Sequence, residues 1–380
     1  MFEGVIAGIR RVCEQPEGLI PLHAPWFDEA DERAVAACVR STFVSSVGAE
    51  ITAFEQDLAT FTGAPFAVAV VNGTAALHTA LVLLNVGAND LVITQPFTFI
   101  ATCNAITYTG ARPVFLDIDP DTLGLSPVAT RAWLEEQCEM RSGACVHRLS
   151  GKRVRACIPM HSFGLPMRIA SLVELCNAWN IAVVEDAAEA LGSTSHGRHA
   201  GSVAPIGTLS FNGNKIVTCG GGGALLFHDE QLARAAKHLT TQAKVPHPWE
   251  FAHDRTAYNY RMPNLNAALA RTQLAKLNHN IRVKRELHNA YQEIFTGTPW
   301  SLVNEPDGTR SNYWLNAVLM RDREERDAFL HACMEEGIQA RPAWELATDQ
   351  PMYSDQAHAP TPVSRYHQDR LVNIPSSARR

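Results

Sequence analysis

The sequence predicts an α/β fold with a large domain built on a mainly parallel central sheet and a smaller C-terminal α/β domain. Between residues 66 and 227, short continuous apolar runs alternate with helical patterns, which is typical of a parallel sheet covered by helices on both faces. The chain has 380 residues, of which 46% are hydrophobic, and can bury a core of this size. We place the boundary so that residues 1–250 form the N-terminal segment and the large domain, and residues 251–380 form a linking helix and the small domain.

The elements of the predicted large domain follow one another closely. The apolar runs predict strands at 67–71, 91–93, 114–116, 154–158 and 181–184, and the patterns between them predict helices at 74–84, from 98 onwards and at 172–179. In sheets of this kind, ligands bind beyond the carboxyl ends of the strands. We therefore expect site residues directly after the strands, at 72–74, 95–99, 160–161, 185–186 and in the segment that ends at Lys215.

A different pattern begins after residue 263. Leucines at helical spacing predict a helix from Leu265 to Tyr291 that is too long for a simple crossover and links the two domains. Residues 313–319 then predict a strand, and Glu324–Glu336 predict an amphipathic helix that ends at Gly337. Lys244–Thr256 predicts an irregular segment.

Composition excludes several classes of function. The net charge of −6 and the lack of a basic run argue against nucleic acid or an anionic membrane surface as the partner. No stretch is apolar over a membrane-spanning length and the first residues have no signal-peptide core, so we expect a cytoplasmic protein. The nine cysteines are scattered and never spaced as CxxC, which favours free thiols. No metal site is predicted, because the histidines lack metal-ligand spacing.

Lys215 is the most informative residue of the chain. It ends the segment Ser210–Lys215, which follows an apolar run, and it precedes the glycine run Gly220–Gly223. Pyridoxal phosphate enzymes of the aspartate-aminotransferase fold present their cofactor-binding lysine in this way. A lone lysine in a loop is usually a solvated charge, but Asp186, at the end of an earlier strand, favours the functional interpretation. The glycine run lacks the nucleotide-binding patterns GxGxxG and GxxxxGK[ST], and predicts a close approach of backbone to a cofactor or a neighbouring subunit.

Asp186 and the pair Gly73–Thr74 each allow two interpretations. A carboxylate at the end of an apolar strand is costly unless a cation pairs with it, and a protonated pyridine nitrogen would be such a cation. The alternative is an aspartate that caps the next helix. Gly73–Thr74 follows a strand and opens a helix, so its backbone N–H groups and the threonine hydroxyl could hold a phosphate, or the segment could be an ordinary helix cap.

Two further candidates lie at strand ends. His161 follows a predicted strand on the ligand side, although a lone histidine is more often a structural residue. Phe99 could stack on an aromatic cofactor, although an aromatic residue at this spacing more often belongs to the core.

Taken together, these segments resemble the nucleotide-sugar aminotransferases of the DegT family, which are pyridoxal phosphate enzymes of fold type I. The resemblance runs from Ile20 through 259–262 to Pro375. It rests on four motifs that occur in order, at 71–77 (VNGTAAL), 98–102 (TFIAT), 185–192 (EDAAEALG) and 210–215 (SFNGNK).

The resemblance implies a role for each candidate in binding the cofactor. Lys215 would form the Schiff base, Asp186 would partner the pyridine nitrogen, and Phe99 would stack on the ring. The residues that would hold the phosphate are Gly73, Thr74 and Ser210.

The same resemblance implies a homodimer with shared active sites, because Asn259 matches a position that reaches the phosphate in the neighbouring subunit. His161, with a catalytic role, and Glu189 would line the site. Many family members have glutamine at the position of Glu189, near the phenolic oxygen of the cofactor, where two acceptors would repel each other unless a proton is shared.

Residues 41–48 and 214–223 are most similar to the branch that aminates UDP-linked 4-keto-6-deoxy-N-acetylhexosamines for legionaminic-acid and bacillosamine-type pathways. The implied substrates are a UDP-sugar and L-glutamate, with Lys215 as covalent anchor and as general acid and base. One alternative is a sugar 3-dehydratase, which resembles this family but has histidine in place of the lysine. A second is a non-catalytic regulator that senses a nucleotide sugar. A nicotinamide-dependent sugar enzyme would need an early GxGxxG, which is absent.

Overall fold

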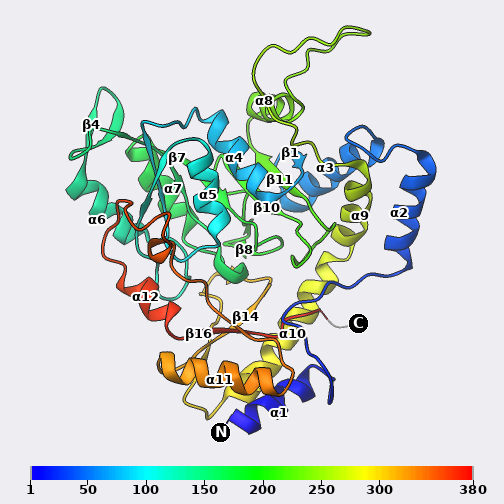
Figure 1. Cartoon of the computed structure of the whole chain (residues 1–380), viewed down its shortest axis with the longest axis vertical. Helices are drawn as coiled ribbons and strands as arrows, with labels where there is room; N and C mark the ends of the chain where they lie inside the picture. The colour runs from blue at the N-terminus through cyan, green and yellow to red at the C-terminus, as the bar shows by residue number, and fades with distance from the viewer. Residues whose placement is uncertain (1, 379–380) are drawn as a thin grey trace.

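The large part of the protein is built on a nine-stranded sheet whose central strands are parallel (Figure 1). The computed structural model describes residues 2–378. From β10 to β3 all neighbouring strands pair in parallel, and β11 is antiparallel to β1 and β10, so the predicted mainly parallel sheet is confirmed. Along the main path the strands lie in the order β1 (Phe66–Val70), β11 (Gly223–Phe227), β10 (Ile206–Ser210), β7 (Ala182–Asp186), β6 (Arg153–Ile158), β2 (Asp90–Thr94) and β3 (Arg112–Phe115).

Successive side chains of these strands are buried on opposite faces of the sheet. Val68 and Val70 pack with one set of helices, whereas Ala69, between them, packs with the other set. The first face is covered by α4 (Gly73–Leu83), α5 (Ile100–Tyr108) and α8 (Glu230–Thr240). The second face is covered by α3 (Ala49–Thr62), α6 (Pro127–Gln137), α7 (Ile169–Ala178) and α9 (Asn264–Ala275), and α2 (Glu29–Ser41) packs on α9.

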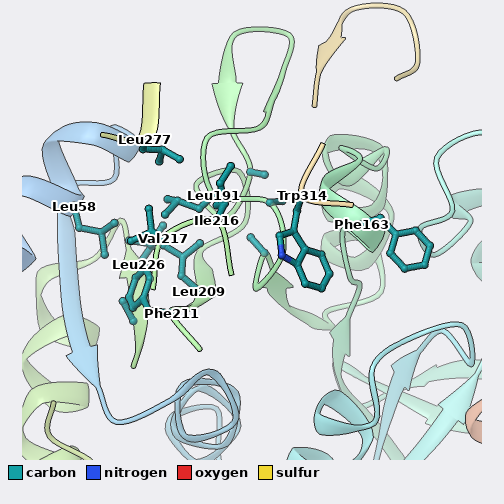
Figure 2. Packing of buried hydrophobic residues seen from close by; sticks show 14 of the residues in the cluster. Leu58, Phe163, Leu191, Leu209, Phe211, Ile216, Val217, Leu226, Leu277 and Trp314 are labelled. Atoms are coloured by element: carbon teal, nitrogen blue, oxygen red, sulfur yellow. The ribbon is translucent and has the colours of Figure 1, made fainter. Parts of the chain in front are cut away.

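The carboxyl ends of β1, β10, β7 and β6 meet at one edge of the sheet, because these four strands run in the same direction. Lys215 lies just beyond this edge. The loop that carries it is fixed by buried side chains on both sides in sequence, Phe211 before it and Ile216 and Val217 after it (Figure 2). The loop therefore presents the lysine from a rigid base.

The smaller part is an antiparallel sheet in the order β12 (Ser301–Leu302), β14 (Asn316–Leu319), β16 (Leu371–Ile374) and β15 (Arg341–Pro342). One face packs on α10 (Leu277–Phe295), α11 (Arg323–Glu335) and α1 (Phe2–Val12). The predicted division at residue 250 assigns α1 to the large domain, whereas its contacts lie with the C-terminal elements.

The single linking helix expected from Leu265 to Tyr291 is two helices in the structure. The chain breaks at Lys276, so that α9 packs on α2 and α3 of the large part while α10 continues into the small part. Three short strands join the two parts in a further sheet, β13 (Thr309–Arg310), β8 (Thr194–Ser195) and β9 (Arg198–His199).

Four further elements complete the part of the chain that the structure describes. They are the hairpin of β4 (Cys138–Arg141) and β5 (Ala144–His147), helix α12 (Pro362–Gln368), and the short helices η1 (Ser162–Gly164) and η2 (Ala347–Asp349). Lys244–Thr256 contains no helix or strand, as predicted, and projects from the body of the molecule beyond α8 (Figure 1). None of the helices within residues 2–378 is long and apolar enough to cross a membrane.

Candidate active site

A pocket of about 570 Å³ opens at the carboxyl edge of the large sheet, against the small sheet. It brings together most of the predicted site residues, although they come from four separate segments. Those that line it are Gly73, Thr74, Phe99, Asp186, Glu189, Ser210 and Lys215. The small part closes the pocket with Trp314, Leu315, Arg341, Pro342, Trp344 and Asn373.

One end of the pocket is the N-terminus of α4. Asn72 caps this helix, and its Oδ1 accepts a hydrogen bond from the Ala75 N–H at 2.7 Å. A Cβ atom at Gly73 would lie 2.9 Å from Ser210 Cβ, so only glycine allows the helix to approach β10 this closely. The hydroxyls of Thr74 and Ser210 line the pocket next to free helix N–H groups, which is an arrangement that suits a phosphate.

The glycine run supports the same end from behind. A Cβ at Gly223 would lie 2.4 Å from the backbone carbon of Asn72, so this glycine lets β11 pack on the turn that starts α4. At Gly223, the close approach is therefore made to the protein's own backbone.

Asp186 lies on the floor of the pocket and is 2% exposed. Its Oδ2 accepts from the Thr102 hydroxyl at 2.8 Å and its Oδ1 from the Ala188 N–H at 3.1 Å. Burial raises the pKa of Asp186, and no ion pair within residues 2–378 neutralises it. No helix begins after β7, which removes the interpretation of Asp186 as a helix cap. A protonated ring nitrogen would supply the missing cation.

Lys215 and Glu189 form a pair in the centre of the pocket. Lys215 Nζ lies 3.2 Å from Glu189 Oε1, and the other carboxylate oxygen accepts from the Phe163 N–H at 2.8 Å. Burial raises the pKa of Glu189, which favours its protonated form. The lysine nitrogen also lies 4.0 Å from the centre of the Trp314 ring, whose Nε1 donates to the Asn214 carbonyl at 2.7 Å.

His161 does not line the pocket, contrary to what the resemblance implied. It is fully buried, and its Nδ1 accepts from the Met167 N–H at 3.1 Å, so its proton lies on Nε2 and is donated to Glu185 Oε1 at 2.9 Å. Both ring nitrogens are therefore committed inside the protein, behind Met160, which is the residue that faces the pocket. The strand-end position indicated the correct edge of the sheet but not the direction of the side chain.

Asn259 also lies outside the pocket. It is exposed and lines a separate hollow of about 950 Å³ together with Ser45–Val47 and Arg261. Within its own chain, Asn259 is therefore not part of the candidate active site.

Most of the residues that sequence reasoning missed come from the small part, and Thr102, which donates to Asp186, is one from the large part. Trp314, Arg341, Trp344 and Asn373 are far from Lys215 in sequence and belong to no motif that we had singled out. Trp314 lies in a segment that predicted only a strand. No group of three or more His, Cys, Asp or Glu side chains that could hold a metal ion occurs in the described part of the chain.

Comparison with known proteins decides among the possible families. Residues 25–379 match the profile of the DegT/DnrJ/EryC1/StrS aminotransferase family. The chain belongs to this family. Its members are aminotransferases that use pyridoxal phosphate, so the enzyme class and the cofactor inferred from Lys215 are confirmed, and the fold is fold type I.

Individual relatives agree with this assignment. The GDP-perosamine synthase of Vibrio cholerae is 32% identical over 361 residues, which are 94% of this chain and 94% of that protein. The GDP-perosamine synthase of Escherichia coli O157:H7 is 33% identical over 94% of this chain and 93% of its own length. The crystal structure of the aminotransferase TlmJ from Streptoalloteichus hindustanus superposes with a TM-score of 0.85 at 27% identity and covers 94% of both chains.

The residues of the pocket fit this cofactor. The α4 N-terminus with Thr74 and Ser210 suits its phosphate, the uncompensated Asp186 suits its protonated nitrogen, and the side chain of Lys215 has the amine that its aldehyde requires. Phe99 is 51% exposed on the wall of the pocket, where a flat ring can cover it.

Proposed function

We propose that this aminotransferase moves the amino group of L-glutamate to the 4-keto carbon of a nucleotide-linked 4-keto-6-deoxy sugar, with UDP as the nucleotide. The proposal rests on one observation above all, which is that Lys215, Asp186 and the α4 N-terminus meet in a single pocket. The glutamate donor and the position of the keto group come from the resemblance of the four motifs.

The nucleotide has two candidates. The similarity of residues 41–48 and 214–223 to the UDP-N-acetylhexosamine branch favours UDP. The names of the Vibrio and Escherichia relatives favour GDP, because each is a GDP-perosamine synthase. A side-by-side comparison of the two nucleotides is therefore part of the test below.

Pyridoxal phosphate, when bound, supplies the aldehyde that accepts the amino group and a ring that takes up electrons from the reacting carbon. Lys215 would hold the cofactor and then, as a free amine, remove the α-proton of glutamate and later place a proton on the sugar carbon. Asp186 would keep the ring nitrogen protonated. The protonated form of Glu189 would donate a hydrogen bond to the phenolic oxygen, which removes the repulsion between two acceptors.

The remaining predicted residues take supporting roles in this proposal. Gly73, Thr74 and Ser210 would hold the phosphate and Phe99 would cover one face of the ring. The contacts of His161 with Glu185 support a positioning role beneath the pocket rather than a proton transfer.

We also propose a homodimer with shared active sites, in the cytoplasm, in which Asn259 completes the phosphate site of the partner. The exposure of Asn259 in its own chain supports this arrangement. Exposed apolar side chains near the same surface also support it, at Phe43, Val44, Val47, Trp249 and Phe251.

The test is the visible absorption spectrum of the purified enzyme with pyridoxal phosphate, before and after L-glutamate, for wild type, Lys215→Ala and the control Lys152→Ala. We expect glutamate to bleach the band of the lysine-bound cofactor in wild type and in the control, and a 4-keto-6-deoxy UDP-sugar to restore it. Lys215→Ala should show neither the band nor turnover. Restoration by the GDP-sugar alone would replace UDP by GDP, and a band that ignores glutamate would contradict the donor.

The dehydratase alternative loses its support here, because it requires histidine where this chain has Lys215. Release of 2-oxoglutarate in the same experiment would exclude the non-catalytic sensor.

A further inference from the structure

Arg341 is a cation of the pocket that no carboxylate neutralises. The charged residues on the pocket wall are Asp186, Glu189, Lys215 and Arg341. Lys215 already pairs with Glu189. Arg341 makes one hydrogen bond, from Nη1 to the Ala340 carbonyl at 2.9 Å, and no ion pair within residues 2–378. A guanidinium has five N–H donors, so most of its donors remain available to a ligand.

Asn373 lies beside it, and its side chain makes no hydrogen bond within residues 2–378. It is 4% exposed, its Oδ1 is buried with no hydrogen bond, and it faces the pocket. A buried amide that makes no hydrogen bond costs free energy, so a side chain of this kind is expected to meet a ligand. The enclosed Oδ1 is the acceptor end of the amide, so the N–H₂ group is the end left to donate to a ligand in the pocket.

The two residues form one unit of the small sheet. Arg341 on β15 and Asn373 on β16 are directly opposite in the antiparallel ladder, so their side chains project from the same face about 5 Å apart. This face carries Ala317 and Leu371 of the core shared with the large part, whereas Val372 and Ile374 face the helices on the other side.

We propose that Arg341 and Asn373 form a second oxyanion site of the pocket, which binds the carboxylate of the amino donor or the diphosphate of the nucleotide sugar. The cofactor phosphate is held by the α4 N-terminus of the large sheet, whereas this pair lies on the wall made by the small sheet. The guanidinium of Arg341 offers a fork of charged N–H donors, and the amide of Asn373 adds a neutral donor beside it. Together they can bind either oxyanion, with the reacting end of the substrate directed toward Lys215. The inference rests on the proposed function, since it names the side chains that bind the anionic group of a substrate of the proposed reaction.

The test is isothermal titration calorimetry of the pyridoxal phosphate-loaded enzyme with three unreactive probes, 2-oxoglutarate, UDP and GDP. Wild type, Arg341→Gln, Asn373→Asp and the control Arg323→Gln, an exposed arginine of α11, are compared. We expect Arg341→Gln to weaken one probe class by about tenfold or more, as the loss of a charged hydrogen bond predicts. Asn373→Asp should weaken the same class, because it sets a carboxylate against the anion.

A loss for 2-oxoglutarate identifies the carboxylate of the donor, and a loss for UDP and GDP identifies the diphosphate. Affinities in Arg341→Gln equal to those of wild type, or no binding of any probe to wild type, would overturn the proposal. Because Arg341 is exposed, we expect Arg341→Gln to fold even if the substitution at buried Asn373 prevents folding. The calorimetry measures binding without turnover, so it tests the anion site separately from the aminotransferase reaction. The absorption spectrum with glutamate tests that reaction.

Discussion

At the scale of single residues, the chemistry of the pocket depends on two buried carboxyl groups in different surroundings. Asp186 is held by two hydrogen-bond donors, while Glu189 has a lysine amine and a backbone N–H. Burial raises the pKa of both groups. In the proposed enzyme Asp186 is forced into its charged form by the cofactor's ring nitrogen, and Glu189 keeps its proton.

Replacing Asp186 by asparagine should stabilise the cofactor-free enzyme and inactivate the loaded one. A carboxyl whose pKa is raised on folding contributes stability at low pH that is lost as the pH rises through the raised value. At pH 8 the wild type therefore carries a buried charge that Asp186→Asn does not. We expect the melting temperature of the cofactor-free variant to exceed that of wild type at pH 8 and to approach it near pH 4, in differential scanning fluorimetry.

The control is Asp307→Asn, which changes an exposed aspartate. A lower melting temperature of Asp186→Asn at pH 8, or full turnover with glutamate, would show that the carboxylate has a different partner from the one proposed.

Replacing Glu189 by glutamine should leave the enzyme active and change its pH dependence. In the proposed enzyme, protonated Glu189 donates to the phenolic oxygen, so we expect cofactor affinity in wild type to fall by up to about tenfold per pH unit above its raised pKa. Glutamine donates at every pH. Fluorescence titration with pyridoxal phosphate from pH 6 to pH 9 should give a smaller decrease for Glu189→Gln than for wild type, and parallel curves would rule out a protonated Glu189.

At the scale of elements, the site depends on how closely α4 approaches β10. Gly73→Ala places a methyl group 2.9 Å from Ser210 Cβ, so the helix start or the strand end must move. Overpacking of this kind costs about 1–3 kcal/mol, and we expect pyridoxal phosphate to bind about tenfold more weakly. Gly87→Ala is the matched control, because nothing lies within 4 Å of its added Cβ. Equal cofactor affinities of the two variants would show that phosphate binding does not depend on the close contact at Gly73.

The sequence predicted the large-domain elements well and the small-part contribution poorly. Strands such as β7 are continuous apolar runs buried on both faces, which is a strong local signal. Asp186 ends β7, Gly73 follows β1, and Lys215 lies in the loop after β10. The break at Lys276 has no glycine or proline to announce it and results from α9 and α10 packing on different parts. The direction of the His161 ring is set by Glu185 and Met167, which are tertiary neighbours. Arg341 and Asn373 meet the pocket only through the pairing of β15 with β16.

At the scale of the whole molecule, the proposed dimer makes each active site depend on two chains. Lys215→Ala and Asn259→Ala should each lose most of the activity as homodimers. In a heterodimer of the two, one site combines both substitutions and the other is fully native if Asn259 acts across the interface. When the two variants are mixed, unfolded and refolded together, about half of the dimers are heterodimers, and each of these has one native site of two. About a quarter of the wild-type activity should therefore return, as a two-fold symmetric assembly requires. No recovery in heterodimers verified by mass spectrometry would place Asn259 outside the partner's site.

The proposed chemistry of the pocket depends on Lys215 as the residue that holds the cofactor. Treatment of the cofactor-saturated enzyme with sodium borohydride makes the bond between lysine and cofactor permanent, and peptide mass spectrometry then locates it. We predict the cofactor's mass on the peptide that contains Lys215. An unmodified Lys215 peptide, or the cofactor's mass on any other lysine, would show that Lys215 does not hold the cofactor.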